Sequence, residues 1–130
     1  MATDPRAILQ QFLTALEAKD EASVAALVAD DVARVEHPNR FCPPGRRQTK
    51  PELLDGLRKG AGLLASERYV IEDCVVDGER IAARLTWEAA LAIPIGEQKA
   101  GDRLTADLAL FVTVRDDRIV AIHNYDCFHP

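Results

Sequence analysis

The chain has 130 residues, of which 48% are hydrophobic and 28% are charged, and its formal net charge is −5 at pH 7. This length fits a single domain over residues 1–130, with one core and room for one ligand cavity. The acidic balance argues against nucleic-acid binding, which needs clustered Lys and Arg. No apolar run approaches the roughly 20 residues needed to cross a bilayer. The first residues contain no apolar signal core, so we expect a cytoplasmic protein without a membrane partner.

The cysteines are three in number and widely spaced along the chain: Cys42, Cys74 and Cys127. An odd, scattered set does not suggest a disulfide framework. We expect three reduced thiols.

Helices are predicted in the first half of the chain. Thr3 or Asp4 can cap the first, with Pro5 in its first turn. A shorter helix follows and ends at residues 30–31, and Thr49 is typical of the N-cap of a third helix that ends near residues 60–62. Each helix carries an apolar stripe at helical spacing. The stripes are Ile8, Phe12, Leu13 and Leu16 in the first, Val24, Leu27 and Val28 in the second, and Leu53, Leu54 and Leu57 in the third.

Strand-like alternation marks the remaining elements. Residues 32–37 alternate as a short strand that ends at Pro38, with Val35 and His37 on one face and Arg34 and Glu36 on the other. Four further strands are predicted, joined by turns such as Asp77-Gly78. Their expected ranges are 68–76, 81–91, 104–114 and 119–128.

This order of elements favours an α+β fold, a curved antiparallel sheet packed on three N-terminal helices. The helices would cover one face of the sheet. The other face would then be solvated or form a dimer interface. The residues expected there include Arg34, Arg84, Thr86, Glu88, Thr105 and Asp107.

Four short segments carry a resemblance to a known family: residues 12–13, 27–32, 35–38 (Val-Glu-His-Pro) and 122–126 (Ile-His-Asn-Tyr-Asp). In order and spacing, the chain resembles the nuclear transport factor two-like superfamily and, within it, the SnoaL-like branch. The resemblance implies a cone-shaped domain, often a homodimer, with a pocket between sheet and helices. Relatives of this branch include ketosteroid isomerases, polyketide cyclases and limonene epoxide hydrolases. Because their activities differ widely, the fold does not assign a reaction.

His37 is the first candidate for a catalytic residue. Ketosteroid isomerases carry Val-Glu-Asp-Pro where this chain has 35–38, so the resemblance places His37 at the position of their general base. An imidazole can take or give a proton near neutral pH. The alternative is a histidine at a strand end that bonds only backbone or solvent. The isomerases' oxyanion donors fall at Phe12 and Leu110, which cannot donate hydrogen bonds, and this argues against steroid isomerisation.

Asp126 is the second candidate. Alternation places it on one strand face with Asn124, and SnoaL-like cyclases use an acidic residue late in the chain. The resemblance implies that this face lines the pocket, where Asp126 would orient His37. The alternative is a carboxylate bonded to backbone near the strand end. Asn124 falls at the last position of the epoxide hydrolases' Asp–Arg–Asp trio and could donate one hydrogen bond to a ligand.

The pocket wall is expected to be mostly apolar. Trp87 would present its ring and lend its N–H to a ligand, or else be an ordinary core residue. Tyr125 has the wrong strand parity and is expected on the sheet face. A loop with Arg40, Arg46 and Arg47 lies at the pocket mouth in this family, where it would attract an anionic group or remain solvated. The predicted walls are Phe12, Val35, Leu57, Leu85, Trp87, Leu108 and Leu110.

No metal site and no cofactor are predicted. His123, Asp126, Cys127 and His129 cluster in sequence, but an extended strand separates the two histidines by roughly 20 Å. Two ligands at a chain end make a weak site. Phosphate-loop and dinucleotide-binding motifs are absent from the sequence.

The sequence therefore predicts an acid–base enzyme that isomerises, cyclises, hydrates or hydrolyses a small hydrophobic molecule, with His37 as base or acid and Asp126 as its partner. The alternative is a non-catalytic ligand-binding or dimerisation module with the same cavity. The resemblance also implies a homodimer through the outer sheet face.

Overall fold

The elements of the chain form three helices and one six-stranded sheet in the computed structural model, which describes residues 4–130. This confirms the predicted α+β fold. In chain order they are α1 (Pro5–Glu17), α2 (Glu21–Leu27), β1 (Val28–Glu36), β2 (Arg46–Gln48), α3 (Lys50–Gly60), β3 (Leu64–Asp77), β4 (Arg80–Leu91), β5 (Arg103–Arg115) and β6 (Arg118–Phe128).

Side-chain caps fix where the helices begin. The Asp4 carboxylate accepts a hydrogen bond from the Arg6 backbone N–H (3.1 Å), and Thr49 and Glu52 form a reciprocal capping box at α3. The predicted caps at Asp4 and Thr49 are confirmed, whereas Thr3 lies outside the described residues. Within residues 4–130, no helix is long and apolar enough to cross a membrane.

The sheet has the strand order β2-β1-β6-β5-β4-β3. Its last four strands form the predicted antiparallel meander, while β1 pairs in parallel with β6. The chain becomes extended at Val28, directly after α2, so the second helix is shorter than predicted and β1 longer. The short strand β2 was not predicted, because it lies in a segment rich in Pro, Gly and Arg.

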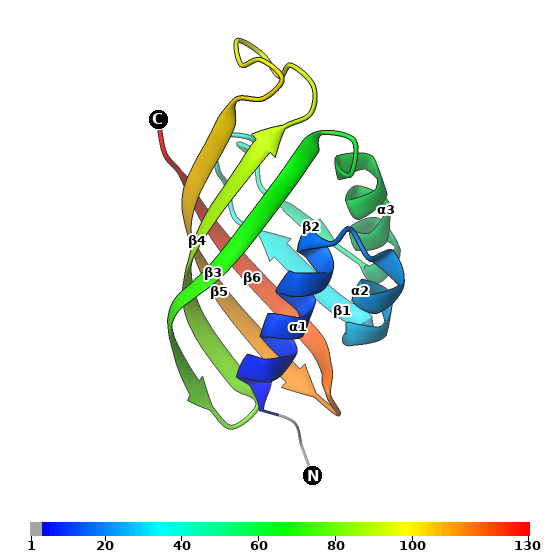
Figure 1. The fold of residues 1–130 in the computed structure, drawn as a ribbon. Coiled ribbons are helices and arrows are strands. Elements are labelled where there is room, and N and C mark those ends of the chain that lie inside the picture. Colours follow the sequence, from blue (N-terminus) through cyan, green and yellow to red (C-terminus); the bar gives the residue numbers. More distant parts are fainter. Residues whose placement is uncertain (1–3) are drawn as a thin grey trace.

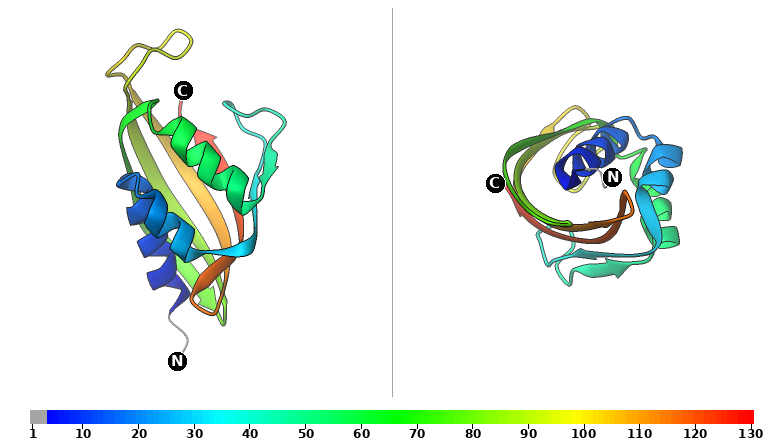
Figure 2. Two further views of the ribbon diagram at one scale, coloured as in Figure 1. Left: turned by 90° about the vertical axis from the view of Figure 1, so that its right-hand side faces the viewer. Right: turned by 90° about the horizontal axis from the view of Figure 1, so that it is seen from below.

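Helix α1 lies inside the curve of the sheet, and α2 and α3 lie at its open side (Figure 1 and Figure 2). Helix α1 crosses the concave face of the meander, with α2 and α3 beside it toward β1 (Figure 1). Seen from below, the sheet bends around α1 as an open ring (right view of Figure 2). This arrangement leaves the convex face of the sheet uncovered by helices.

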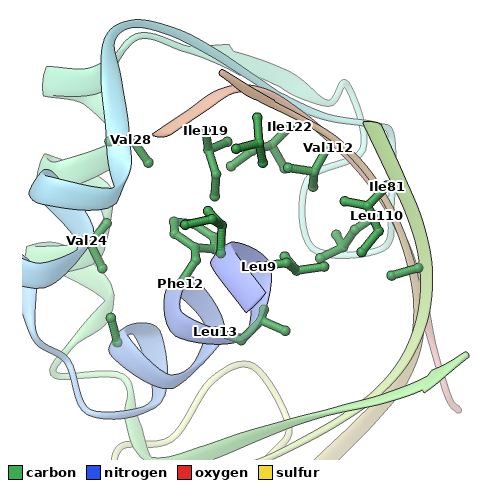
Figure 3. Packing of buried hydrophobic residues seen from close by; sticks show 14 of the residues in the cluster. Leu9, Phe12, Leu13, Val24, Val28, Ile81, Leu110, Val112, Ile119 and Ile122 are labelled. Carbon is green, nitrogen blue, oxygen red and sulfur yellow. The ribbon is translucent and has the colours of Figure 1, made fainter. Parts of the chain in front are cut away.

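The core fills the space between α1 and the sheet. Leu9, Phe12 and Leu13 project from α1 toward Ile122 of β6 and Leu110 of β5 (Figure 3). Burial of such side chains is the main favourable contribution to folding. Phe12, Leu13, Leu110 and Ile122 belong to this core and also line the cavity described below.

We expect Leu85→Ala to lower the free energy of unfolding by about 2–5 kcal/mol, because Leu85 of β4 is 0% exposed and its truncation leaves a cavity. Urea denaturation followed by circular dichroism measures this change. The matched control is Val75→Ala in β3, a side chain that is 69% exposed, for which the change should stay within about 0.5 kcal/mol. Equal losses in the two variants would contradict this account of the core.

Candidate functional site

A cavity of about 300 Å³ lies between the concave face of the sheet and helices α1 and α3. Its volume is at the lower end of the range for small-molecule sites. Most of its wall is apolar. The apolar side chains are Phe12, Leu13 and Leu16 of α1, Leu53 and Leu57 of α3, and Leu108, Leu110, Ile122 and Phe128 of the sheet.

A charged group enters this cavity from β1. Arg34 and Glu36 point to the concave face, since Val32, which has the same strand parity, is a core residue. Arg34 Nη1 donates to Gln48 Oε1 (2.7 Å) and lies 3.6 Å from Glu36 Oε1. Burial lowers the pKa of the Arg34 guanidinium, an effect that the charge of Glu36 opposes.

Glu36 is the ionised partner of this group. Burial alone would raise its pKa, but a hydrogen bond from Asn39 and the charges of Arg34 and Arg46 outweigh that effect and lower it. Arg46 Nε donates to Glu36 Oε1 at 2.9 Å, and Asn39 Nδ2 donates to Oε2 at 2.9 Å. Glu36 therefore carries a negative charge shared by two guanidinium groups.

Asp126 and Asn124 reach the cavity from β6. Asn124 Nδ2 donates to Asp126 Oδ2 at 2.9 Å. Burial raises the pKa of Asp126, and the negative charge of Glu36 raises it further, while Asn124 and Arg34 act in the opposite direction. Asn124 is 4% exposed, and among residues 4–130 its Oδ1 is the one buried side-chain oxygen or nitrogen without a hydrogen-bond partner.

A second polar group lines the cavity on β3 and β4. Glu67 Oε2 accepts hydrogen bonds from Trp87 Nε1 (3.0 Å) and from the Tyr69 hydroxyl (3.3 Å). Burial raises the pKa of Glu67, although these two donors oppose the shift. Burial also raises the pKa of Tyr69, so its hydroxyl remains a hydrogen-bond donor. The cavity thus holds two carboxyl groups whose pKa values are raised by burial.

His37 lies on the other side of the sheet, so its predicted place in the pocket was wrong. Its Nε2 is 3.0 Å from His123 Nδ1, and its ring stacks on that of Tyr125, with 4.0 Å between the ring centres. His129 is also on the outer face, bonded to Asp107 and Thr105. The parity of β1 explains the error, because Val35 is apolar but points outward with His37.

Metal ligands do not converge in the described structure. Within residues 4–130, no group of three or more His, Cys, Asp or Glu side chains is placed to hold a metal ion. The three cysteines are free thiols.

The sequence matches a known protein family over most of its length. The model of the SnoaL-like domain matches residues 9–122. The chain belongs to the SnoaL-like domain family. A comparison with curated proteins finds no match.

Solved structures share this SnoaL-like fold at low sequence identity. The proposed polyketide cyclase IdmH from Streptomyces antibioticus is 19% identical, with a TM-score of 0.81 over 95% of this chain and 92% of that one. An LEH-like epoxide hydrolase from M. tuberculosis is 20% identical, with a TM-score of 0.72 over 94% of this chain and 81% of that one. An NTF2-like protein of unknown function from Burkholderia pseudomallei is 18% identical, with a TM-score of 0.76 over 96% and 92%. These identities establish the fold alone.

The structure brings together most of the residues predicted for the SnoaL-like pocket. Asp126 and Asn124 line the cavity, although His37 is not beside them. Of the predicted walls, Val35 faces outward and Leu85 is wholly enclosed in the core. Trp87 gives its N–H to Glu67, not to open space. The predicted walls that do line the cavity are Phe12, Leu57, Trp87, Leu108 and Leu110.

Sequence reasoning missed four polar residues of the site. Arg34 had been assigned to the outer face and Glu36 had been grouped with it, although Val32 shares their parity. Glu67 lay outside the predicted strand, which began one residue later, and Tyr69 received no role. Glu67 and Tyr69 have the same strand parity as Ile71, which packs against the core. This shared face is the signal that could have identified them.

We expect Asp126→Asn to make the protein more stable than wild type at neutral pH. Folding raises the pKa of the Asp126 carboxyl. The free energy of unfolding therefore falls as pH rises from the pKa of the unfolded state to that of the folded state, by about 1.4 kcal/mol for each unit between the two pKa values. Urea denaturation from pH 4 to pH 8 measures this. The advantage of the variant should grow with pH across that window and disappear in acid. Asp31→Asn on the exposed surface is the control, and a similar pH-dependent gain there would contradict the assignment.

Proposed function

We propose that this SnoaL-like chain is a cofactor-independent acid–base enzyme that acts on a small, largely apolar molecule. The observation that carries the proposal is Asp126, a carboxyl group with a raised pKa in the wall of an otherwise mostly apolar cavity. Carboxyl groups in such surroundings keep a proton at higher pH and can deliver it to a substrate. The reaction classes that fit are isomerisation, cyclisation, and the addition of water as in a hydratase or hydrolase.

Asp126 would act as the general acid. In its protonated form it can give a proton to an oxygen on which negative charge develops, and the resulting carboxylate can take a proton back in the next step. Asn124 holds one carboxyl oxygen at 2.9 Å, which limits rotation of the group. Arg34 lies close enough for its charge to act on Asp126 and would stabilise both the carboxylate and a substrate oxyanion.

Tyr69 would supply the hydroxyl donor that Phe12 and Leu110 cannot, by turning its O–H from Glu67 to the substrate. It lines the cavity, and its electrostatic interactions with Asp126 and Arg34 support a role beside them. The apolar walls would exclude water and strengthen these electrostatic interactions. That a proposed polyketide cyclase and an epoxide hydrolase share the fold supports a reactive cavity.

We expect Asp126→Asn to lower kcat at least 100-fold on any substrate the wild type converts, because it removes the transferable proton. Turnover is measured by mass spectrometry on a panel of cyclic epoxides, β,γ-unsaturated ketones and aromatic β-keto esters. Wild-type activity should fall as pH rises through the pKa of Asp126, since the protonated form is the active one. Ligand affinity, read from the fluorescence of Trp87 in the cavity wall, should change only a few-fold.

Asp107→Asn is the control for this experiment, because its carboxylate lies on the outer face and is 59% exposed. It should retain wild-type turnover. Full activity of Asp126→Asn would refute the role of Asp126. Binding by the wild type without turnover of any panel member would favour the alternative, a non-catalytic ligand-binding module.

We also propose that the outer face of the sheet forms a homodimer. Phe111 and Tyr125 are 51% and 43% exposed on this face, and their rings pack edge to face with 5.8 Å between centres. Clustered exposed aromatic side chains are typical of interfaces.

Phe111→Glu should convert such a dimer into a monomer, since two symmetry-related charges would lie in the apolar contact. Sedimentation velocity at micromolar concentration measures the change in mass. Val76→Glu, at a 42% exposed position of β3 whose register partners Ile81 and Val112 face the core, is the matched control and should remain dimeric. A wild-type monomer under these conditions would refute the dimer.

A further inference from the structure

Two guanidinium groups at the cavity share one carboxylate. Arg46 Nε donates to Glu36 Oε1 at 2.9 Å, and Arg34 Nη1 approaches the same oxygen at 3.6 Å. Both arginines line the cavity. The side chain of Arg34 is 24% exposed, so water compensates its charge only in part. Two positive charges against one negative charge leave this wall with a positive excess whenever Asp126 is protonated.

Arg34 also has unused hydrogen-bond donors. Within residues 4–130, every hydrogen bond and ion pair of its guanidinium runs through Nη1, to Gln48 and Glu36. Its Nε and Nη2 have no partner in that part of the chain. These two nitrogens form one edge of the planar guanidinium, and such an edge binds the two oxygens of a carboxylate side by side.

Asp126 is a titratable neighbour of Arg34 in the cavity wall. It interacts electrostatically with Arg34 but forms no ion pair with it at 4.0 Å or less among the described residues. Asn124 holds its Oδ2, and Glu36 of β1 is the other charged group that acts on it. Tyr69 faces the same centre from β3, with its hydroxyl directed to Glu67. An anion bound on Arg34 would stand beside the Asp126 carboxyl and favour its protonated form.

The remainder of the cavity requires an apolar ligand body. Leucine and phenylalanine side chains supply most of the apolar part of the cavity wall. Their burial against a ligand is favourable only for hydrocarbon or aromatic groups.

We propose that the cavity binds an amphipathic monocarboxylic acid, with the carboxylate side-on against Nε and Nη2 of Arg34 and with uptake of one proton by Asp126. The proton moves from solvent to an Asp126 oxygen, which then donates a hydrogen bond to the bound carboxylate. This inference rests on the proposed function in one respect, that the cavity is the ligand site, and it names the anchoring group of the ligand.

A matched set of three ligands tests the proposal: 4-phenylbutyrate, 4-phenylbutan-1-ol and methyl 4-phenylbutyrate. Calorimetry in two buffers of different ionisation enthalpy gives affinity and proton uptake. The acid should bind at least tenfold more tightly than the alcohol and the ester at pH 6. Its affinity should fall up to tenfold per pH unit above the pKa of Asp126, because one proton is coupled to binding.

Four variants assign these effects to residues. Arg34→Lys keeps the positive charge but loses the edge formed by Nε and Nη2. It should lower the affinity for the acid at least tenfold and leave the affinity for the alcohol unchanged. Asp126→Asn should abolish proton uptake and the pH dependence. Should Arg34→Lys fail to fold, Arg46→Gln replaces it. This variant should lower the affinity for the acid several-fold, because the charge of Glu36 is then balanced by Arg34 alone. Arg47→Gln, the neighbouring residue outside the cavity lining, is the control and should bind like wild type.

Equal affinity for the three ligands, or acid binding that none of the cavity variants changes, would overturn the proposal. Tight binding of the alcohol and ester without the acid would also overturn it, while leaving the cavity as a small-molecule site. If none of the three binds, this inference fails, whereas the proposed enzyme is decided separately by turnover of the neutral panel.

Discussion

The parallel pairing of β1 with β6 determines which polar side chains meet inside this protein. Residues paired across a sheet point to the same face. The register sets Glu36 beside Asn124 and Arg34 beside Ile122, so these side chains enter the concave face together. The same register sets Val35 beside His123 on the convex face. A shift of one residue would exchange the two groups and leave the cavity without its arginine.

Burying these charges costs free energy, and the site limits that cost in different ways. Arg34 and Glu36 remain charged because each lies near the other and accepts or donates further hydrogen bonds. Within residues 4–130, Asp126 and Glu67 form no ion pair, and burial raises the pKa of both carboxyl groups. One mostly apolar cavity thus contains an ion pair and two carboxyl groups whose pKa values are raised. A core without function would be more stable if apolar side chains of similar volume occupied these positions.

Elements with strong local signals could be predicted from the sequence, and elements that depend on tertiary pairing could not. The caps at Asp4 and Thr49 and the alternation of the last three strands are local features, and they were predicted correctly. The local sequence does not reveal which face of β1 points inward, because Val32 and Val35 are both apolar and lie on opposite faces. Only the pairing with β6 decides between them. The strand β2 has three residues and exists because β1 offers it an edge, which no local pattern can reveal.

The two cavity carboxyl groups are not equivalent, and the difference bears on which of them can exchange its proton with a ligand. Two donors, from Trp87 and Tyr69, bind the same oxygen of Glu67. Donors of this kind favour the carboxylate and fix its orientation. Asp126 receives one side-chain donor, from Asn124, whose own Oδ1 lies buried without a partner. If the amide turned over, that oxygen could accept the proton of a neutral Asp126, so Asn124 can serve either charge state of the carboxyl. Glu67 is therefore better suited to positioning the aromatic wall, and Asp126 to proton transfer.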